Sequence, residues 1–109
     1  MPIADAKKWK TFETKNQDAY GKCCVDVARE IMRKLDEDPS PITDTHKLVC
    51  DADKAISGGG ITGFMAGCVA SMIWQVHSRG QEFKDAWNKG HGVASSVQGV
   101  VNPAILTVK

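Results

Sequence analysis

The sequence predicts an all-α protein: a compact bundle of three to five helices around a long central helix at about residues 61–89. Two observations support this prediction. A run without charged residues follows a triple glycine and extends to Val76, and a one-sided amphipathic run then continues to Gly90. Through both runs, apolar or small residues recur three or four positions apart, as on one buried helical face: Ala66, Val69, Ile73, Val76, Gly80, Phe83 and Trp87.

The first segment, residues 4–37, is predicted to be helical. Its apolar residues repeat at helical spacing: Trp9, Phe12, Tyr20, Cys24, Val27, Ile31 and Leu35. The polar run at 14–18 and Gly21 weaken this pattern, so the segment is either one helix or two helices with a break near residues 15–18. Pro39 and Pro41 cannot continue a helix and therefore end the segment.

A short helix is predicted at about residues 44–56. Thr43 is suited to cap its N-terminus, and Asp44 in the first turn complements the helix dipole. Its apolar residues have the spacing of a helix that lies on a core: Leu48, Val49, Ala52, Ala55 and Ile56. The residues at 57–60 end this helix and form a tight turn before the central helix.

Small residues recur every four positions in the central helix, at Gly63, Gly67 and Ser71. Because glycine in a helix costs about 1 kcal/mol relative to alanine, this stripe predicts close contact with a neighbouring backbone. The sequence at 88–90 predicts the end of the helix. The uncharged tail, residues 91–108, is predicted to form a short helix and then a segment that docks on its own domain or on a partner subunit.

Composition favours a single domain of an ordinary water-soluble protein. Hydrophobic residues make up 42% and charged residues 25% of 109 residues, and the net charge is +1, so no bulk field attracts nucleic acid. The charged N-terminus lacks the apolar stretch of a secretory signal, which predicts a cytoplasmic protein with buried, reduced thiols at Cys23, Cys24, Cys50 and Cys68. Residues 61–76 are too few for a membrane span.

The glycine turn is the first candidate binding site. Gly58, Gly59 and Gly60 precede a helix, and the N–H groups at a helix N-terminus bind anions. No lysine occurs between residues 55 and 83, so the phosphate-binding loop pattern is absent. Two interpretations stay open: an interhelical turn with glycines at positive φ, or a site that binds an anion or a backbone.

A second candidate site lies around Gly80. His77, Arg79 and Glu82 fall within two turns of one helix, where the arginine could bind a carboxylate or phosphate of a ligand or partner. The alternative is a solvated ion pair beside a capped histidine. Trp87, near the end of the buried face, is predicted to reach a surface and serve as an interface anchor.

We predict no catalytic residue, metal or cofactor. His46 and Cys50 have the i, i+4 spacing of metal ligands, but no second pair completes a four-ligand site. No strand–turn–helix motif presents a nucleophile beside a base.

The string GGITGFMAGCVASMIWQVHSRGQEFKDAWNK, followed by VVNPAILTV, resembles a group of small bacteriophage and prophage proteins without an assigned activity. The resemblance covers residues 58–109, with an echo in YGKCCVDVAREIMRKLDE. It implies a phage-type accessory protein inside the host cell, where proteins of this size act by binding. Some such proteins block host defence machinery, and others sequester nucleotide signals.

Three functions follow, in order of preference. The first is non-enzymatic binding by a phage or mobile-element accessory factor that modulates a host or phage protein. Self-association belongs to this hypothesis, because a helix about 45 Å long would overhang so small a bundle. The second is a protein that sequesters a nucleotide or another anion between the Gly58–Gly60 turn and Arg79, either within one chain or across a subunit boundary. The third is a small enzyme.

Overall fold

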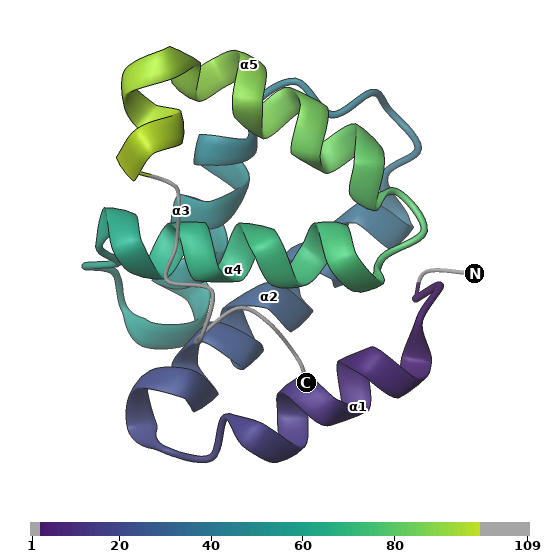
Figure 1. Cartoon of the computed structure of the whole chain (residues 1–109), viewed down its shortest axis with the longest axis vertical. Coiled ribbons are helices and arrows are strands. Elements are labelled where there is room, and N and C mark those ends of the chain that lie inside the picture. The colour runs from purple at the N-terminus through teal and green to yellow at the C-terminus, as the bar shows by residue number, and fades with distance from the viewer. Residues whose placement is uncertain (1–2, 99–109) are drawn as a thin grey trace.

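The computed structural model describes the backbone of residues 3–98 and the side chains of residues 3–90. Five helices follow one another in this range (Figure 1): α1 (Ala6–Lys15), α2 (Ala19–Glu37), α3 (Thr45–Ser57), α4 (Gly63–Val76) and α5 (Gly80–Gln98). The described residues contain no strand beyond an isolated antiparallel bridge between Ile3 and His77. The predicted all-α bundle is confirmed.

Side-chain caps begin four of these helices. Asp5, Asp18, Asp44 and Thr62 each accept a hydrogen bond from the backbone N–H three residues further on. Such a bond satisfies one of the N–H groups that have no partner inside the helix. Helix α3 is capped by Asp44 and not, as predicted, by Thr43.

The N-terminal segment is two helices, which decides between the two alternatives for residues 4–37. Helix α1 ends at Asn16, whose side-chain amide donates to the carbonyl of Phe12 (2.8 Å). Asp18 then caps α2 by accepting from the N–H of Gly21 (2.6 Å). A Cβ on Gly21 would lie 2.8 Å from side-chain atoms of Asn16 and Asp18, so glycine gives the cap its room.

The prediction of one central helix at 61–89 is wrong. Helix α4 ends at Val76, and the chain turns at residues 77–79 into α5 (Figure 1). In a continuous helix the carbonyl of Val76 would accept from Gly80. Here it accepts from the N–H groups of Ala4 (2.7 Å) and Asp5 (3.1 Å), while the N–H of Gly80 donates to the carbonyl of His77 (2.9 Å). The N-terminal segment thus occupies the Val76 carbonyl, which would have to accept from Gly80 if the helix continued.

The predicted boundary at residue 90 is also wrong, because α5 continues to Gln98. A glycine ends a helix by adopting positive φ. Among the glycines that the structure describes, only Gly58, Gly59 and Gly60 do so. The remainder of the predicted tail, residues 99–108, lies outside the described residues.

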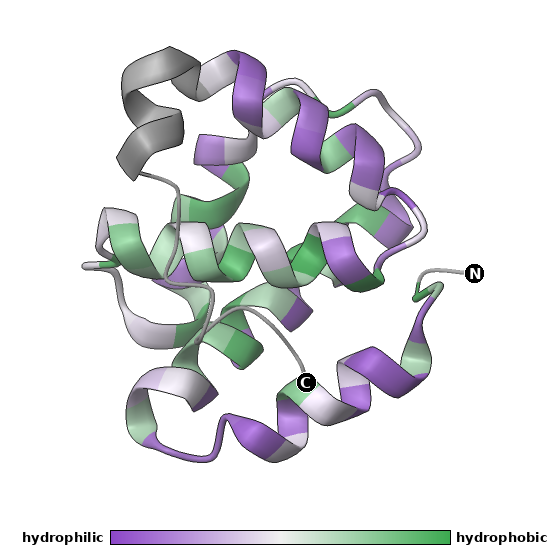
Figure 2. Ribbon diagram, in the orientation of Figure 1, coloured by the Kyte–Doolittle hydropathy of each residue, from purple (hydrophilic) through white to green (hydrophobic). Residues whose placement is uncertain are grey.

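Helix α4 is the centre of the bundle. It packs against α5 on one side and against α1 and α2 on the other, and it is the most apolar helix (Figure 2). The predicted apolar face is buried on both sides of the break, at Val69, Ile73 and Val76 in α4 and at Phe83 in α5. The periodicity therefore identified the core face correctly, although two antiparallel helices provide it.

The small-residue stripe of α4 is only partly buried. Gly67 and Ser71 lie in the interior. Gly63 is exposed, and a Cβ placed on it would meet no atom within 4 Å. A close approach to a neighbouring backbone occurs at Gly80, where a Cβ would lie 2.5 Å from the carbonyl oxygen of Trp74.

All four cysteines are free thiols. Cys24 and Cys68 are buried and Cys23 is half-buried, whereas Cys50, predicted to be buried, is exposed. None of the helices in the described part of the chain is both long and apolar enough to cross a bilayer.

Candidate functional site

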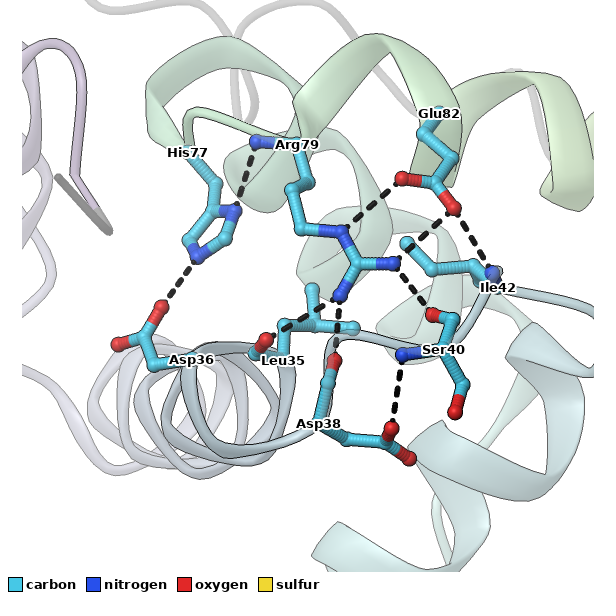
Figure 3. A network of polar contacts seen from close by, with 8 residues as sticks. All are labelled: Leu35, Asp36, Asp38, Ser40, Ile42, His77, Arg79 and Glu82. Atoms are coloured by element: carbon cyan, nitrogen blue, oxygen red, sulfur yellow. Dashed lines mark hydrogen bonds and ion pairs between the residues drawn. The ribbon is translucent and has the colours of Figure 1, made fainter.

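A polar network joins the start of α5 to the end of α2 (Figure 3). Nε and Nη2 of Arg79 donate to the two carboxylate oxygens of Glu82, each at 3.0 Å. Nη1 donates to the carbonyls of Leu35 (3.2 Å) and Asp38 (2.7 Å), and Nη2 donates to the carbonyl of Ser40 (2.6 Å). A guanidinium has five N–H donors, so Arg79 uses all of them within the chain.

This network holds the connection between α2 and α3. The carbonyls of Leu35 and Asp38 lie at the C-terminal end of α2, where no further turn supplies N–H partners. Arg79 therefore caps α2 from a different helix. Glu82 extends the network by accepting from the backbone N–H of Ile42 (2.8 Å). These contacts favour a structural role for Arg79 and Glu82 over the predicted ligand contact.

His77 belongs to the same junction and is buried, with 5% of its surface exposed. Its Nδ1 accepts from the backbone N–H of Arg79 (3.0 Å), so the ring proton lies on Nε2, which donates to Asp36 (2.8 Å; Figure 3). In a continuous helix the N–H of Arg79 would donate to the carbonyl of residue 75. The imidazole replaces that acceptor and stabilises the turn between α4 and α5.

The Glu82 carboxylate makes this junction sensitive to acid. Its hydrogen bonds from Arg79, and then from Ile42 N–H, hold the pKa of Glu82 below its ordinary value. A lowered pKa stabilises the fold above the unfolded-state pKa and loses that contribution as pH falls through the folded-state value. We therefore expect Glu82→Gln to flatten the decline in melting temperature between about pH 5 and pH 3.

The control for this effect is a double variant. The hydrogen bond from Arg79 is the main cause of the lowered pKa of Glu82. Adding Glu82→Gln to Arg79→Met should therefore change the decline in melting temperature at acid pH only slightly. Glu82 is 41% exposed, so salt should weaken the effect. Equal pH profiles of the wild type and Glu82→Gln would contradict the assignment.

The glycine turn lies at the opposite end of α4. Gly58, Gly59 and Gly60 have φ of 86°, 108° and 90°, which confirms the predicted positive φ. Asp53 holds the turn: it is 2% exposed and accepts from the N–H of Ile61 (2.9 Å) and from the Ser57 hydroxyl. A Cβ placed on any of the three glycines would meet no atom within 4 Å, so their backbone is open to an approaching molecule.

Trp87 does not reach the surface as predicted. It is 4% exposed and stacks on Phe83, with ring centroids 6.5 Å apart. Trp87 instead lines a cavity of about 440 Å³ between α3, α4 and α5.

The predicted site residues therefore do not form one site. His77, Arg79 and Glu82 lie together at the C-terminal end of α4. The glycines lie at its N-terminal end, 14 residues away along the helix, or about 21 Å. The predicted pocket between the glycine turn and Arg79 is not formed within the described residues of one chain.

An exposed apolar surface surrounds the glycine turn. The large hydrophobic side chains that are exposed in the described part of the chain are Tyr20 (39%), Ile56 (43%) and Phe64 (41%). The rings of Tyr20 and Phe64 lie 6.2 Å apart and connect the first turn of α2 to the first turn of α4. Ile56 lies in the last turn of α3, just before the glycines. We call this group the end surface: Tyr20, Ile56, Gly58, Gly59, Gly60 and Phe64.

Three important residues were not identified from the sequence. In the sequence, Asp36 and Asp53 look like any carboxylate on a solvent-exposed helix face. The one available signal was that Asp53 lies five residues before three consecutive glycines, whose turn leaves backbone N–H groups in need of an acceptor. Thr45 is 2% exposed and lines the 440 Å³ cavity, but nothing in its neighbourhood in the sequence predicts this.

The two residues with metal-ligand spacing, His46 and Cys50, lie close together. Cys50 Sγ lies 3.6 Å from His46 Nε2. No group of three or more candidate metal ligands occurs within the described residues.

Together, these features define a small all-helical protein whose internal polar network supports the fold and whose accessible features are an apolar surface and a cavity. The chain belongs to the family described as the Type I Thoeris inhibitor Tad4, which matches residues 1–109. It is thus a phage anti-defence protein, and the resemblance to small phage proteins is confirmed in this more specific form. Curated proteins and solved structures gave no match.

Proposed function

We propose that this protein inhibits Thoeris by stoichiometric binding, without catalysis, to a protein component of that host defence system. The family description supplies the target system. The end surface is the observation that supports protein binding. It gathers the exposed large hydrophobic side chains of the described residues at one end of the bundle, around an open turn. Such an inhibitor acts in the host cytoplasm.

The end surface has the composition of an interface core. From Ala55 to Val76 the chain carries no charged residue, and residues 54–60 and 62–64 are exposed. The cores of protein interfaces are depleted in charge and enriched in aromatic side chains. The three glycines add a stretch of backbone without side chains, which a partner can approach closely. We therefore expect a partner with a complementary apolar, weakly charged face.

A second copy of the chain is a weaker candidate for this surface. The prediction of self-association depended on a long helix that overhangs the bundle. Because that helix is broken at residues 77–79, the molecule measures 31 × 30 × 28 Å and has no such overhang. The oligomeric state itself stays a prediction, to be measured by light scattering.

The test replaces the apolar side chains of the end surface. We expect Ile56→Ser and Phe64→Ser each to weaken binding to the Thoeris target about thirtyfold, the effect of losing an interface hot spot. Both side chains are exposed, so the melting temperature should change little. Binding of purified components by calorimetry, and phage plating on Thoeris-positive cells, provide the two measurements.

The matched control is Lys10→Ser on the exposed face of α1, which should bind like the wild type. Wild-type affinity of both end-surface variants would contradict the proposal. A change in oligomeric state in place of a change in target binding would identify the surface as a contact between copies.

A further inference from the structure

We infer that the 440 Å³ cavity between α3, α4 and α5 receives an arginine side chain of the protein that covers the end surface. This inference rests on the proposed function and deepens it, because it names one chemical group of the partner. The cavity volume lies within the range of pockets that enclose a small molecule, about 300–1,000 Å³. A long side chain therefore fits, with room for its flanking backbone.

The cavity adjoins the end surface. Ile61, Thr62 and Gly63 line the cavity, and Phe64, the next residue, belongs to the end surface. Thr62 and Gly63 are exposed, so the cavity reaches the molecular surface at this point. A partner that packs on Phe64 therefore also covers the cavity. A side chain that fills a pocket beside an apolar contact is the usual geometry of an interface hot spot.

The lining carries a negative charge and no positive one. Asp44 supplies a carboxylate, and none of the lining residues in the described part of the chain is a lysine or an arginine. One oxygen of Asp44 accepts from the backbone N–H of Lys47 (2.9 Å), whereas the other accepts no hydrogen bond within the described residues. Asp44 is exposed, so this second oxygen is accessible to a partner.

A buried carboxylate increases the negative charge near the cavity. Asp53 is 2% exposed, and its side chain accepts from the N–H of Ile61, a lining residue (2.9 Å), and from the Ser57 hydroxyl. Neither donor is charged, and Asp53 makes no ion pair within the described residues. Buried carboxylates in proteins are normally paired with a cation. A cation beside Ile61 would therefore be stabilised.

The helix N-termini at the cavity do not reverse this balance. Thr45 and Gly63 are the first residues of α3 and α4, and each N-terminus carries about +0.5 of an elementary charge. The two together amount to about +1, against two full negative charges on Asp44 and Asp53. The net field therefore favours a cation over a phosphate or a carboxylate.

Arginine fits this site better than lysine does. Its planar guanidinium donates two parallel N–H bonds to a carboxylate, and its flat face packs on aromatic or apolar surfaces. The cavity wall provides such surfaces at Trp87, Ile61 and Ala86. Arginine is also among the residues enriched at interface hot spots.

One substitution removes the charge of the lining without removing a helix cap. Asparagine is as good an N-cap residue as aspartate, so Asp44→Asn should keep the cap of α3. Asp5→Asn is the matched control, because Asp5 caps α1 with a bond of the same length, 2.9 Å to the N–H of Lys8, and does not line the cavity. A second variant, Ala86→Leu, fills the cavity from α5. We expect all three to melt within about 5 °C of the wild type.

The first experiment titrates the full chain with Nα-acetyl-L-arginine amide and follows the NMR signals of the Trp87 indole and the Gly63 amide. We expect saturable shifts with a Kd of about 1–10 mM, because the probe supplies only one contact of the interface. Nα-acetyl-L-citrulline amide has nearly the same shape without the charge and should bind at least about fivefold more weakly. Asp44→Asn should weaken binding of the arginine probe about fivefold, whereas Asp5→Asn should respond like the wild type.

The second experiment measures binding of the Thoeris target by calorimetry. Asp44→Asn and Ala86→Leu should each weaken this binding about tenfold, because the partner loses its ion pair in the first variant and its space in the second. Salt should reduce the affinity of the wild type more than that of Asp44→Asn. Asp5→Asn should bind the target like the wild type.

The absence of a saturable response to the arginine probe, or equal responses to the arginine and citrulline probes, would overturn this inference. Wild-type target affinity of both Asp44→Asn and Ala86→Leu would also overturn it, while the proposed function would stand if Ile56→Ser and Phe64→Ser still lost target binding. A wild type that bound no Thoeris protein but still bound the arginine probe at the cavity would overturn the proposed function and leave the arginine site supported.

Discussion

Gly80→Ala is expected to lower the free energy of unfolding by about 3 kcal/mol and the melting temperature by about 15 °C. A Cβ at this position would lie 2.5 Å from the carbonyl oxygen of Trp74 and 2.9 Å from its carbonyl carbon and Cα. These are backbone atoms, which cannot rotate away as a side chain can. Helices α4 and α5 would have to separate and loosen the contacts of buried Phe83 and Trp87.

Gly90→Ala is the control on the same helix. A Cβ there would meet no atom within 4 Å, so the higher helix propensity of alanine should raise stability by about 0.5–1 kcal/mol. Urea denaturation of both variants measures the difference. Similar stabilities of Gly80→Ala and Gly90→Ala would show that α4 and α5 do not approach each other as closely as the structure indicates.

The break between α4 and α5 illustrates the limit of sequence periodicity. The apolar face from Val69 to Phe83 predicts which side chains are buried, and all of the large ones are. Periodicity does not predict whether one helix or two provide that face, because both arrangements bury the same residues. The break depends on contacts across the chain: Ala4 and Asp5 donate to the carbonyl of Val76, and His77 pairs with Asp36.

The glycine turn was more predictable than the rest of the candidate site. Three consecutive glycines between apolar runs favour positive φ, because glycine alone enters that region without steric penalty. Residue type cannot reveal that Asp53 is the acceptor that holds the turn, or that Phe64 and Tyr20 meet beside it. Both contacts depend on how α2, α3 and α4 pack.

The role of Arg79 was predicted only in part. The pairing with Glu82 follows from the i, i+3 spacing on a helix. Sequence spacing contains no information about the carbonyls of Leu35, Asp38 and Ser40, which lie about 40 residues away in the chain. Those carbonyls take the donors that a phosphate or carboxylate ligand would have needed.

Arg79→Met is expected to destabilise the fold by about 3 kcal/mol while leaving target binding intact at temperatures well below melting. Methionine keeps the apolar stem but removes all five donors, so the Leu35 carbonyl loses the bond from Arg79 and the Glu82 carboxylate keeps only the bond from Ile42 N–H. The exposed carbonyls of Asp38 and Ser40 can be rehydrated, which limits the loss. Arg79→Lys should recover only part of it, because an ammonium group lacks the planar fork that serves several acceptors at once. Thermal denaturation gives the stability, and hydrogen exchange at Ile42 reports the release of the connection between α2 and α3.

Arg33→Met separates this effect from the loss of an ordinary ion pair. Arg33 also contacts two carboxylates, those of Glu30 (2.8 Å) and Glu37 (2.5 Å), but it is 53% exposed and donates to no backbone carbonyl among the described residues. Exposed ion pairs contribute little, so this variant should melt close to the wild type. If Arg79→Met melted equally close to the wild type yet lost target or nucleotide binding, Arg79 would be a ligand contact and not the cap of α2.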